Sequence, residues 1–485
     1  MKKAFSRKNL WEMTPACLKG VLGHVMSALP LPWLLGRRYR QWRRFLEEAQ
    51  WWDSEQCRAY QFKRLKDIIT LAYESTEFYR ESFDDVGFEP GDFKELKDLS
   101  GLPMIDKAII RENLDRMLTS PPAKSGVDYV TTSGTTGNPL PFYMDSSRHG
   151  VEFAHLSLSW GRVGYRLGSP MAVMRGTPLE LDRTGIHHRY DPLLRHHVYS
   201  SFHLTAEEMH KCVAHMHAVH PGFLHAYPSS AYILCRFMAA EGLEFPESLR
   251  AILFESETMY EHQKEFIQSH FPVKLFSSYG HTEKLMFAAQ CESSSLYHVW
   301  PTYGYCEVLE TDGKPVEVGC RGEMIGTGFI NRIVPFIRYR TADYAVLAGH
   351  GCPDCGRKHM LLDDICGHRS QEFLVTKDRR VIIAYIILNT HDDTFDGIIK
   401  FQFLQTVPGK AELHLVAAPG DPTYDLGRIR RHIEGKVGGQ IDIALKLCDD
   451  IPPLKSGKKP VVLQEIEGVE EIDHDLEVYG IDLQP

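Results

Sequence analysis

The chain has 485 residues, a formal net charge of −9, 43% hydrophobic residues and 25% charged residues. This length predicts at least two domains, because a single domain usually holds about 100–200 residues. The composition excludes a disordered chain, and the acidic balance argues against a nucleic-acid partner, which would favour a basic surface.

The N-terminal segment is basic but shows no clear export signal. Trp11–Pro15 interrupts any apolar run after the first lysines, and the next apolar run, Leu18–Leu35, contains a lysine and two prolines. We therefore expect a packed N-terminal helix in a cytoplasmic protein. The alternative is a peripheral contact with the inner face of the membrane through the arginines that follow. Those arginines are Arg37, Arg38, Arg40, Arg43 and Arg44.

The hydrophobic pattern predicts layered α/β structure followed by a β region. Residues 40–85 and 147–165 have helical spacing, and residues 170–260 alternate short apolar strands with helices. Such alternation predicts parallel strands. From Tyr303 onward, strands and turns predict antiparallel pairing. The expected strands of the alternating region are Met171–Met174, His197–Phe202, Phe223–Ala226, Ala251–Phe254 and Lys274–Ser277, and its expected helices are 205–219, 229–241 and 260–270.

A smaller unit begins near residue 370. We expect an α/β protein with two domains: a large N-terminal domain of layered sheets plus a small β region, residues 1–369, and a small mobile α+β domain, residues 370–485. The strands expected in the small domain are 372–376, 380–384, 400–407 and 411–417, and its expected helices are 385–392 and 423–437.

A loop rich in hydroxyl groups and glycine, Thr131–Pro139, lies between two predicted strands, 128–130 and 140–143. Its glycines allow backbone N–H groups to face a ligand, and its hydroxyls add neutral donors, which together suit a phosphate. The loop lacks the Gly-Lys-Ser/Thr of a Walker A sequence. The alternative interpretation is a surface hairpin turn.

Four further motifs follow this loop. Ser277–Glu283 supplies an aromatic ring, a hydroxyl and a carboxylate, which suit a purine, a phosphate and Mg²⁺. Pro335–Asp343 is expected to end a strand with a carboxylate that can accept the ribose hydroxyls. Asp364–Ser370 contains one arginine, and Pro453–Lys458 places a lysine on a loop. Each motif alone is typical of ordinary structure, but five in this order are a strong signal.

The set resembles the adenylate-forming superfamily of acyl-CoA synthetases and firefly luciferase, and within it the phenylacetate–CoA ligase-like family. Tyr279–Glu283 is similar to the superfamily's Tyr-Gly-x-Thr-Glu motif. Ile337–Asp343 resembles the family's Ile-Arg-Tyr-Arg-Thr-x-Asp and is the most specific match. The resemblance covers roughly residues 60–460 and implies a protein that binds ATP and releases AMP and pyrophosphate.

The resemblance implies a role for each matching residue. Thr282 would contact the α-phosphate, Glu283 would hold Mg²⁺, and Lys458 would bridge the substrate carboxylate and the α-phosphate. Asp343 would bind the ribose, with Arg369 nearby. The residues that would cradle the β- and γ-phosphates are Ser133, Gly134, Thr135, Thr136 and Gly137, and those that would line the adenine are Ser256, Glu257, Tyr279 and Gly280.

The implied chemistry is attack of a carboxylate on the α-phosphorus of ATP. Charge grows on the phosphoryl oxygens, so Lys458 and Mg²⁺ would stabilise the transition state. In the resembled family the small domain supplies the lysine and then rotates for the second step. The matching hinge falls near Ser370–Glu372.

A metal site is expected from the cysteines. The chain has 11 of them and no export signal, so disulfides are not expected. Cys352 and Cys355 form a Cys-x-x-Cys pair, and with Cys291 and His298 they make a tetrahedral set for structural Zn²⁺. Some members of the resembled family carry a similar arrangement. The alternatives are His350 or His359 as ligands, or reduced cysteines without a metal.

The small domain departs from the phenylacetate enzymes. Asn138 replaces the usual loop lysine, Gln371-Glu372 stands where Asp-Asp is usual, and Lys377–Ala384 replaces a Gly-Val-Asn-Val-Phe-Pro stretch on the face presented to CoA. The CoA step is therefore less supported than adenylation. Val375–Arg380 resembles the branch associated with capsular-polysaccharide gene clusters, in which the acceptor could be an amine or a hydroxyl of a sugar.

Histidines are dense in the region where the acyl site is expected. They indicate either a polar pocket or a solvated loop face. The dense set is His187, His188, Arg189, His196, His197 and His203.

The leading functional hypothesis is a carboxylate-activating ligase that forms an acyl-adenylate and transfers the acyl group to an amine, hydroxyl or thiol. The first rival is an aryl- or acyl-CoA ligase. The second is a nucleotide-binding scaffold without catalysis, which would have little need of Lys458. A homodimer is common among the resembled ligases.

Overall fold

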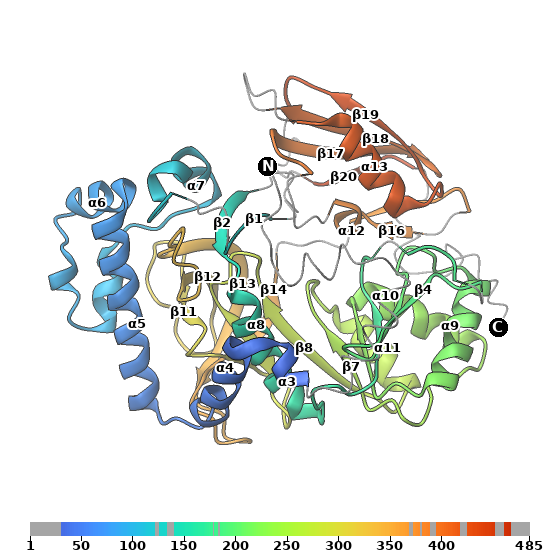
Figure 1. Ribbon diagram of the computed structural model, residues 1–485, viewed down its shortest axis with the longest axis horizontal. Helices are drawn as coiled ribbons and strands as arrows, with labels where there is room; N and C mark the ends of the chain where they lie inside the picture. The colour runs from blue at the N-terminus through green and yellow to red at the C-terminus, as the bar shows by residue number, and fades with distance from the viewer. Residues whose placement is uncertain are drawn as a thin grey trace. The chain divides into compact units, whose positions relative to one another are not determined.

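The computed structural model forms two compact units, each assembled from separate stretches of the chain (Figure 1). The first unit joins Met1–Val130, Phe142–Gly168 and Phe276–Gly367, and the second joins Thr131–Pro141, Ser169–Leu275 and His368–Pro485. The predicted division between residues 369 and 370 adjoins residues outside the described set and stays a prediction. The structure describes residues 31–121, 126–132, 140–177, 179–182, 185–367, 372–378, 381–388, 394–417, 424–451 and 460–466.

The predicted helix over 40–85 is divided in the first unit by two capping residues. Asp53 accepts a hydrogen bond from the backbone N–H of Gln56 at 2.8 Å, and Thr76 accepts one from Tyr79 at 3.2 Å. Each cap satisfies backbone donors that a helix start leaves unpaired, so each begins a new helix. The helices of this unit are α3 (Leu31–Leu34), α4 (Gly36–Ala49), α5 (Ser54–Ser75), α6 (Glu77–Asp84), α7 (Lys107–Asn113) and α8 (Arg148–Trp160).

The basic helix α4 packs against α8. Tyr39 lies 5.7 Å from Phe153 and Trp42 lies 5.5 Å from His155, measured between ring centroids. Most of the apolar run Leu18–Leu35 lies outside the described residues. Among the helices that are described, none combines the length and the apolar character needed to cross a bilayer.

The sheet of the first unit is antiparallel throughout, in the order β11-β12-β13-β14-β10-β9-β8. The antiparallel pairing predicted from Tyr303 onward is confirmed. Its buried core includes Met286, Val308, Met324 and Leu362. The strands are β8 (Lys274–Gly280), β9 (Phe287–Gln290), β10 (Tyr297–Val299), β11 (Gly304–Leu309), β12 (Arg321–Gly328), β13 (Tyr339–His350) and β14 (Met360–Cys366).

The second unit contains the predicted parallel sheet, in the order β7-β6-β3-β5-β4. Strands β7, β6, β3 and β5 pair in parallel, while β4 pairs with β5 in the antiparallel sense. Strand β4 was not predicted, and β5 ends at Tyr199 rather than Phe202. The strands are β3 (Met171–Met174), β4 (His188–Asp191), β5 (His196–Tyr199), β6 (Phe223–Ala226) and β7 (Ala251–Phe254), and the helices are α9 (Ala206–Val219), α10 (Pro228–Ala240) and α11 (Glu261–His270).

A smaller four-stranded sheet, in the order β19-β18-β17-β20, also belongs to the second unit. Helix α13 contributes Ile429, Ile433 and Val437 to its core, which also includes Phe202 and Tyr227. The α+β character predicted for this segment is confirmed. Its elements are β15 (Phe373–Val375), β16 (Val381–Ile383), α12 (Ala384–Leu388), β17 (Ile398–Val407), β18 (Lys410–Ala417), α13 (Leu426–Val437), β19 (Asp442–Leu447) and β20 (Val462–Gln464).

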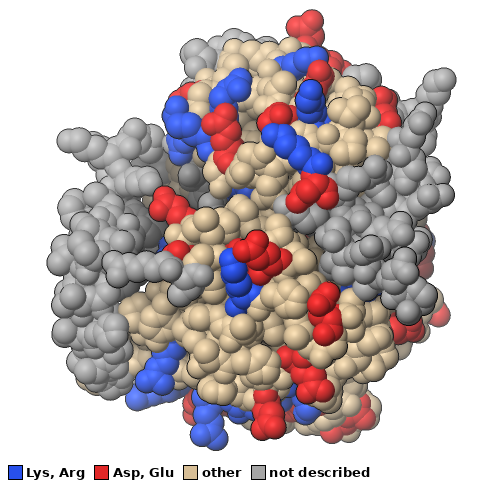
Figure 2. All heavy atoms as spheres, turned by 90° about the vertical axis from the view of Figure 1, so that its right-hand side faces the viewer, with Lys and Arg blue, Asp and Glu red and all other residues tan. Residues whose placement is uncertain are grey.

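Charges of both signs are interspersed on the face of the molecule seen in Figure 2. Lysine and arginine alternate there with aspartate and glutamate, and no broad basic field covers this face. The phosphate backbone of a nucleic acid binds to broad basic surfaces of that kind.

Candidate active site and metal centre

The strands on both sides of the hydroxyl-rich loop form a two-stranded sheet, β1 (Val127–Thr131) with β2 (Pro141–Asp145). The Thr132 backbone N–H donates to the Leu140 carbonyl, and the Leu140 N–H donates to Thr132 Oγ1, each over 3.0 Å. These two bonds close the base of the loop, so the predicted strand–loop–strand arrangement is confirmed. The loop residues Ser133, Gly134, Thr135, Thr136 and Gly137 lie outside the described residues, and their phosphate-binding role stays a prediction.

Two motifs meet where Tyr279 contacts Asp343. Tyr279 is the penultimate residue of β8, with Gly280 at its end, and its hydroxyl donates to Asp343 Oδ2 over 2.7 Å. Burial and the neighbouring Asp343 carboxylate raise the pKa of the Tyr279 phenol well above its ordinary value. The phenol therefore stays a donor, and it holds one oxygen of a carboxylate that is only 6% exposed.

A second carboxylate, that of Glu283, lies in the turn after β8 and is also 6% exposed. The hydroxyl of Tyr339 donates to Glu283 Oε1 over 3.4 Å. Thr282 occupies the same turn. Tyrosines from β8 and β13 thus hold two buried carboxylates within one unit, and hard oxygen ligands of this kind suit Mg²⁺.

The arginines of the Ile337–Asp343 motif stabilise the scaffold. Arg338 forms two hydrogen bonds of 3.1 Å with Glu307, and it donates to the carbonyl of Leu102 over 2.7 Å. Arg340 donates to Glu323 over 2.6 Å. Paired, charge-assisted bonds of this type fix both partners in one geometry. The most family-specific motif therefore contains two side chains that are already engaged by the protein.

Asp343 does not end a strand, contrary to the sequence prediction. It lies inside β13, where the pairing with β12 shifts between Glu323 and Ile325. The backbone at the shift is left-handed at Ala342, with φ of +59°, and its N–H donates to Glu323 Oε1 over 3.2 Å. A bulge of this kind redirects side chains without ending the strand, and here it presents Asp343 to Tyr279. The sequence gives no marker for the bulge because Ala342 is not glycine.

Glycines of β11 and β12 allow the segment after Glu283 to lie directly on the sheet. A Cβ added at Gly304 would lie 1.7 Å from the Leu285 carbonyl oxygen, and one at Gly326 would lie 2.8 Å from the Leu285 Cβ. Leu285 itself is 1% exposed. The position of the Glu283 turn therefore depends on the absence of side chains beneath it.

Replacing Gly304 with alanine is expected to destabilise the protein by at least about 1–3 kcal/mol, because overpacking displaces backbone rather than a flexible side chain. The free energy of unfolding in urea measures the effect. Gly101→Ala is the matched control, since its added Cβ has no neighbour within 4 Å. Equal stability of the two variants would contradict the close approach.

Ser256 and Glu257 lie in the second unit, and both are held by protein groups. Glu257 accepts hydrogen bonds from the backbone N–H and the hydroxyl of Ser229, each over 2.9 Å, near the start of α10. Ser256 has φ of +73°, and its hydroxyl accepts from Arg175 over 2.9 Å. Glu257 thus satisfies donors at a helix N-terminus. The role of both residues beside the adenine stays a prediction.

The catalytic lysine assigned from the resemblance, Lys458, and Arg369 both lie outside the described residues. Both ends of the segment around Lys458 are tied to strand β17. Lys400 forms an ion pair with Asp450, and Gln402 donates to the Pro460 carbonyl over 2.9 Å. These contacts fix the points at which that segment leaves and rejoins the small sheet.

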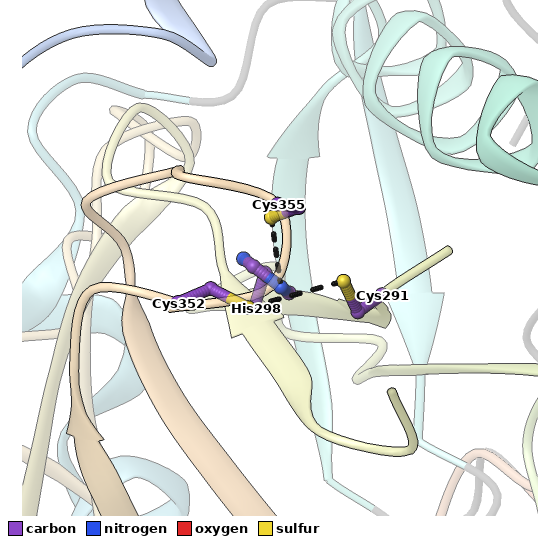
Figure 3. A group of neighbouring side chains, drawn as sticks. All are labelled: Cys291, His298, Cys352 and Cys355. Carbon is purple, nitrogen blue, oxygen red and sulfur yellow. Dashed lines mark hydrogen bonds between the residues drawn. The ribbon is translucent and has the colours of Figure 1, made fainter. Parts of the chain in front are cut away.

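The cysteines and the histidine predicted to bind zinc come together in the first unit (Figure 3). Cys291 follows β9, His298 lies in β10, and Cys352 and Cys355 lie in the turn between β13 and β14. One ligand atom from each of the four lies within 4.8 Å of the others. The Sγ atoms of Cys291 and Cys352 are 4.0 Å apart, and Cys355 Sγ is 3.8 Å from His298 Nε2.

These separations fit a tetrahedral metal site. With Zn–S of about 2.3 Å and Zn–N of about 2.0 Å, tetrahedral geometry places two sulfurs about 3.8 Å apart and sulfur about 3.5 Å from nitrogen. Burial, together with Arg162 and Arg357 nearby, lowers the pKa of His298 to about 3, so its imidazole is neutral. Of the alternative ligands, His359 lies 5.6 Å from His298 between ring centroids and is not part of the four-residue set, nor is the exposed His350.

Sequence reasoning missed the residues that hold the site in place. Tyr339, Glu323 and Glu307 each contact a motif residue from another part of the chain. Tyr339 lies between the two arginines of a motif already recognised, so its position in the sequence could have indicated a role in the site. The two glutamates carried none, because acidic residues in β strands are common on solvated faces.

Comparison with known proteins identifies relatives across most of the chain. The phenylacetate-coenzyme A ligase of Escherichia coli is 25% identical over 82% of this chain and 92% of its own length. Protein CapK of Staphylococcus aureus is 20% identical over 84% of this chain and 89% of its own. A family model described as the CapK C-terminal domain matches residues 374–465.

Over most of its length the chain is similar to the phenylacetate–CoA ligases and to CapK. The solved structure of 2-hydroxyisobutyryl-CoA ligase in the postadenylation state, in complex with R3-HIB-AMP, has a TM-score of 0.54 at 18% identity and covers 90% of this chain and 94% of that one. This similarity establishes the fold shared with that CoA ligase. The family resemblance inferred from the five motifs is confirmed.

Proposed function

We propose that this phenylacetate–CoA ligase homologue activates a carboxylic acid with ATP, forming an acyl-adenylate and releasing pyrophosphate. The observation that carries the proposal is the pair of buried carboxylates, Asp343 and Glu283, each held by a tyrosine hydroxyl within one unit. They lie in the two motifs, Tyr279–Glu283 and Ile337–Asp343, that resemble those of the adenylate-forming ligases, and similar proteins are named phenylacetate-coenzyme A ligases.

In this proposal each carboxylate has a separate task. Asp343 gives one oxygen to Tyr279, and its other oxygen would accept the ribose hydroxyls of ATP. Glu283 would bind the Mg²⁺ that accompanies the phosphates, and the neighbouring Thr282 would donate to the α-phosphate. The loop from Ser133 would hold the β- and γ-phosphates through its N–H groups.

The reaction itself forms one bond and breaks another at the α-phosphorus. A carboxylate oxygen of the acid attacks phosphorus, and the bond to pyrophosphate breaks, so the nucleophile's charge passes to the leaving group. Lys458 would neutralise charge on the phosphoryl oxygens in the transition state. The acyl-adenylate is reactive toward water, so the second acceptor must bind where water is excluded.

Coenzyme A is the first acceptor to test, because the relatives from Escherichia coli and Thermus thermophilus are named phenylacetate-coenzyme A ligases. An amine or a sugar hydroxyl is the second candidate. It is favoured by the match of residues 374–465 to the CapK C-terminal domain and by the departure of Lys377–Ala384 from the phenylacetate enzymes. We place the reaction in the cytoplasm, where ATP and both acceptors occur.

ATP–pyrophosphate exchange over a panel of carboxylic acids tests the proposal. Exchange with at least one acid, independent of CoA, supports adenylation, and a thioester formed on adding CoA then identifies the acceptor. ATP binding without exchange for any acid would instead support a non-catalytic nucleotide-binding scaffold.

Tyr279→Phe is expected to raise the KM for ATP by about 10- to 100-fold while changing kcat little. The substitution keeps the ring but removes the donor to Asp343, and a hydrogen bond to a charged group is worth about 1.5–3 kcal/mol. Steady-state kinetics at saturating acid measure the effect. Tyr344→Phe, on the strand that carries Asp343, is the control, since Tyr344 is 43% exposed. An unchanged KM would contradict the proposed role of Asp343 in nucleotide binding.

We further propose that Cys291, His298, Cys352 and Cys355 bind one structural Zn²⁺. Four protein ligands close the coordination sphere, so the metal would stabilise the fold rather than take part in the reaction. The ligands come from three segments of the first unit, and the metal would join β9, β10 and the turn before β14.

A further inference from the structure

A second group of metal-binding side chains lies in the other unit, far along the chain from the cysteines. It consists of His188, His197 and His215, all partly buried. One ring nitrogen from each lies within 4.8 Å of the other two. In the described residues these three and the cysteine set are the two groups with such spacing.

The hairpin of β4 and β5 places two of the histidines on one face. His188 pairs with Tyr199, and Tyr190 pairs with His197. Alternate residues of a strand share a face, and directly opposed residues share it too. His188, Tyr190, His197 and Tyr199 therefore point to the same side of the hairpin. His188 Nε2 lies 3.2 Å from His197 Nδ1 as a result.

Helix α9 supplies the third histidine, and Figure 1 shows it beside β4. The Tyr199 hydroxyl contacts His215 Nδ1 over 2.8 Å, which fixes the ring and leaves its Nε2 for a ligand. The rings of His188 and His215 are 4.5 Å apart between centroids. Helix and hairpin thus direct three imidazoles toward one point.

An acidic residue orients His188 from behind. Asp182 Oδ2 lies 3.2 Å from His188 Nδ1, and Asp182 Oδ1 accepts the Ile186 N–H over 3.2 Å. A metal-binding histidine usually donates its second nitrogen to a carboxylate, which fixes the tautomer and orients the ring. The pair Asp182–His188 has this arrangement, with Nε2 facing the other histidines.

We propose that His188, His197 and His215 bind a divalent first-row transition metal, Zn²⁺ under cellular conditions, with a fourth position open to an oxygen ligand. Imidazole nitrogens are preferred ligands of these metals, and three histidines with an open position are typical of reactive rather than structural zinc. With Zn–N of about 2.0–2.1 Å, tetrahedral geometry separates two nitrogens by about 3.3 Å, close to the distance between His188 and His197. This site is independent of the adenylation proposal.

Titration with Co²⁺ tests the proposal, using purified full-length protein first dialysed against a chelator that strips a three-ligand site but leaves zinc on the four-ligand cysteine site. One added equivalent is expected to give d–d absorption bands without the thiolate-to-metal charge-transfer band that cysteine ligands produce. Two results would each overturn the proposal. One is that every bound Co²⁺ shows the thiolate charge-transfer band, and the other is that no Co²⁺ binds at a site lacking that band. Only the cysteine cluster produces this band, so the spectra show separately whether the cysteine site and the histidine site bind Co²⁺.

Three variants and one control locate the metal. His188→Gln and His197→Gln should each weaken Co²⁺ binding more than about 100-fold, since losing an outer partner alone costs about 10–100-fold. Asp182→Asn should weaken it by that smaller amount. His217→Gln, exposed on the same helix as His215, should bind like the unmodified protein. Equal binding by all variants would mean that the histidines form only a hydrogen-bonded chain, and the proposal would be wrong.

Discussion

Replacing Lys458 with alanine is expected to slow acyl-adenylate formation about 10²–10³-fold. A group that stabilises developing charge in a water-excluded site is typically worth this much, equivalent to about 2.7–4 kcal/mol of transition-state free energy. The rate of ATP–pyrophosphate exchange with the best acid of the panel measures the loss. Binding of ATP should change little, because the predicted contact of Lys458 strengthens as the phosphorus is attacked.

Lys455→Ala is the matched control for this prediction. It removes the same side chain from the same segment, between the ends that Lys400 and Gln402 tie to β17. Exchange by the control should stay within about twofold of the unmodified protein, as expected for a group that makes no transition-state contact. If Lys458→Ala retains near-normal exchange, the tail lysine has no role in adenylation, although the rest of the site could still function.

Replacing Cys352 with serine is expected to release the zinc of the cysteine cluster and to destabilise the protein by on the order of 4 kcal/mol. Loss of a bound metal is among the few single changes with so large an effect, because metal binding and folding share one free energy. Metal analysis gives the loss of one equivalent with the cluster's thiolate signature, and thermal unfolding gives the change in stability.

Cys320→Ser provides the comparison, since Cys320 is exposed and lies outside the cluster. It should retain its metal and its midpoint of thermal unfolding. The zinc proposal would be wrong if the unmodified protein, purified without added zinc, held no metal at its thiolates. It would also be wrong if Cys352→Ser unfolded at the same temperature as Cys320→Ser.

The fold was largely predictable because its signals are local. The alternation of short apolar strands with helices between residues 170 and 260 predicted parallel strands, and β3, β6 and β7 have the predicted bounds. The change to turns after Tyr303 predicted antiparallel pairing. Strand β4 was missed because its polar sequence was equally consistent with a solvated loop face or a polar pocket, although His188 faces His215 of α9 in the folded chain.

The site was predictable only in part, because the contacts that shape it join distant residues. The motif positions of Tyr279 and Asp343 are 64 residues apart, and spacing alone did not show that one donates to the other. The bulge at Ala342 depends on Glu323, a strand glutamate without a motif. Predicting the three-histidine group requires the register of β4 against β5, which the positions of the histidines in the sequence do not provide.

The engagement of Arg338 and Arg340 by Glu307 and Glu323 affects how relatives should be sorted. A homologue that keeps both arginines but has lost Asp343 is expected to fold and to score as a family member, while losing the nucleotide contact that we propose for Asp343. A family profile weighted toward that arginine pair would consequently recognise proteins that share the fold, whether or not they are active enzymes. Separating working enzymes from pseudoenzymes calls for the acidic positions, scored together with the tyrosine that orients each of them.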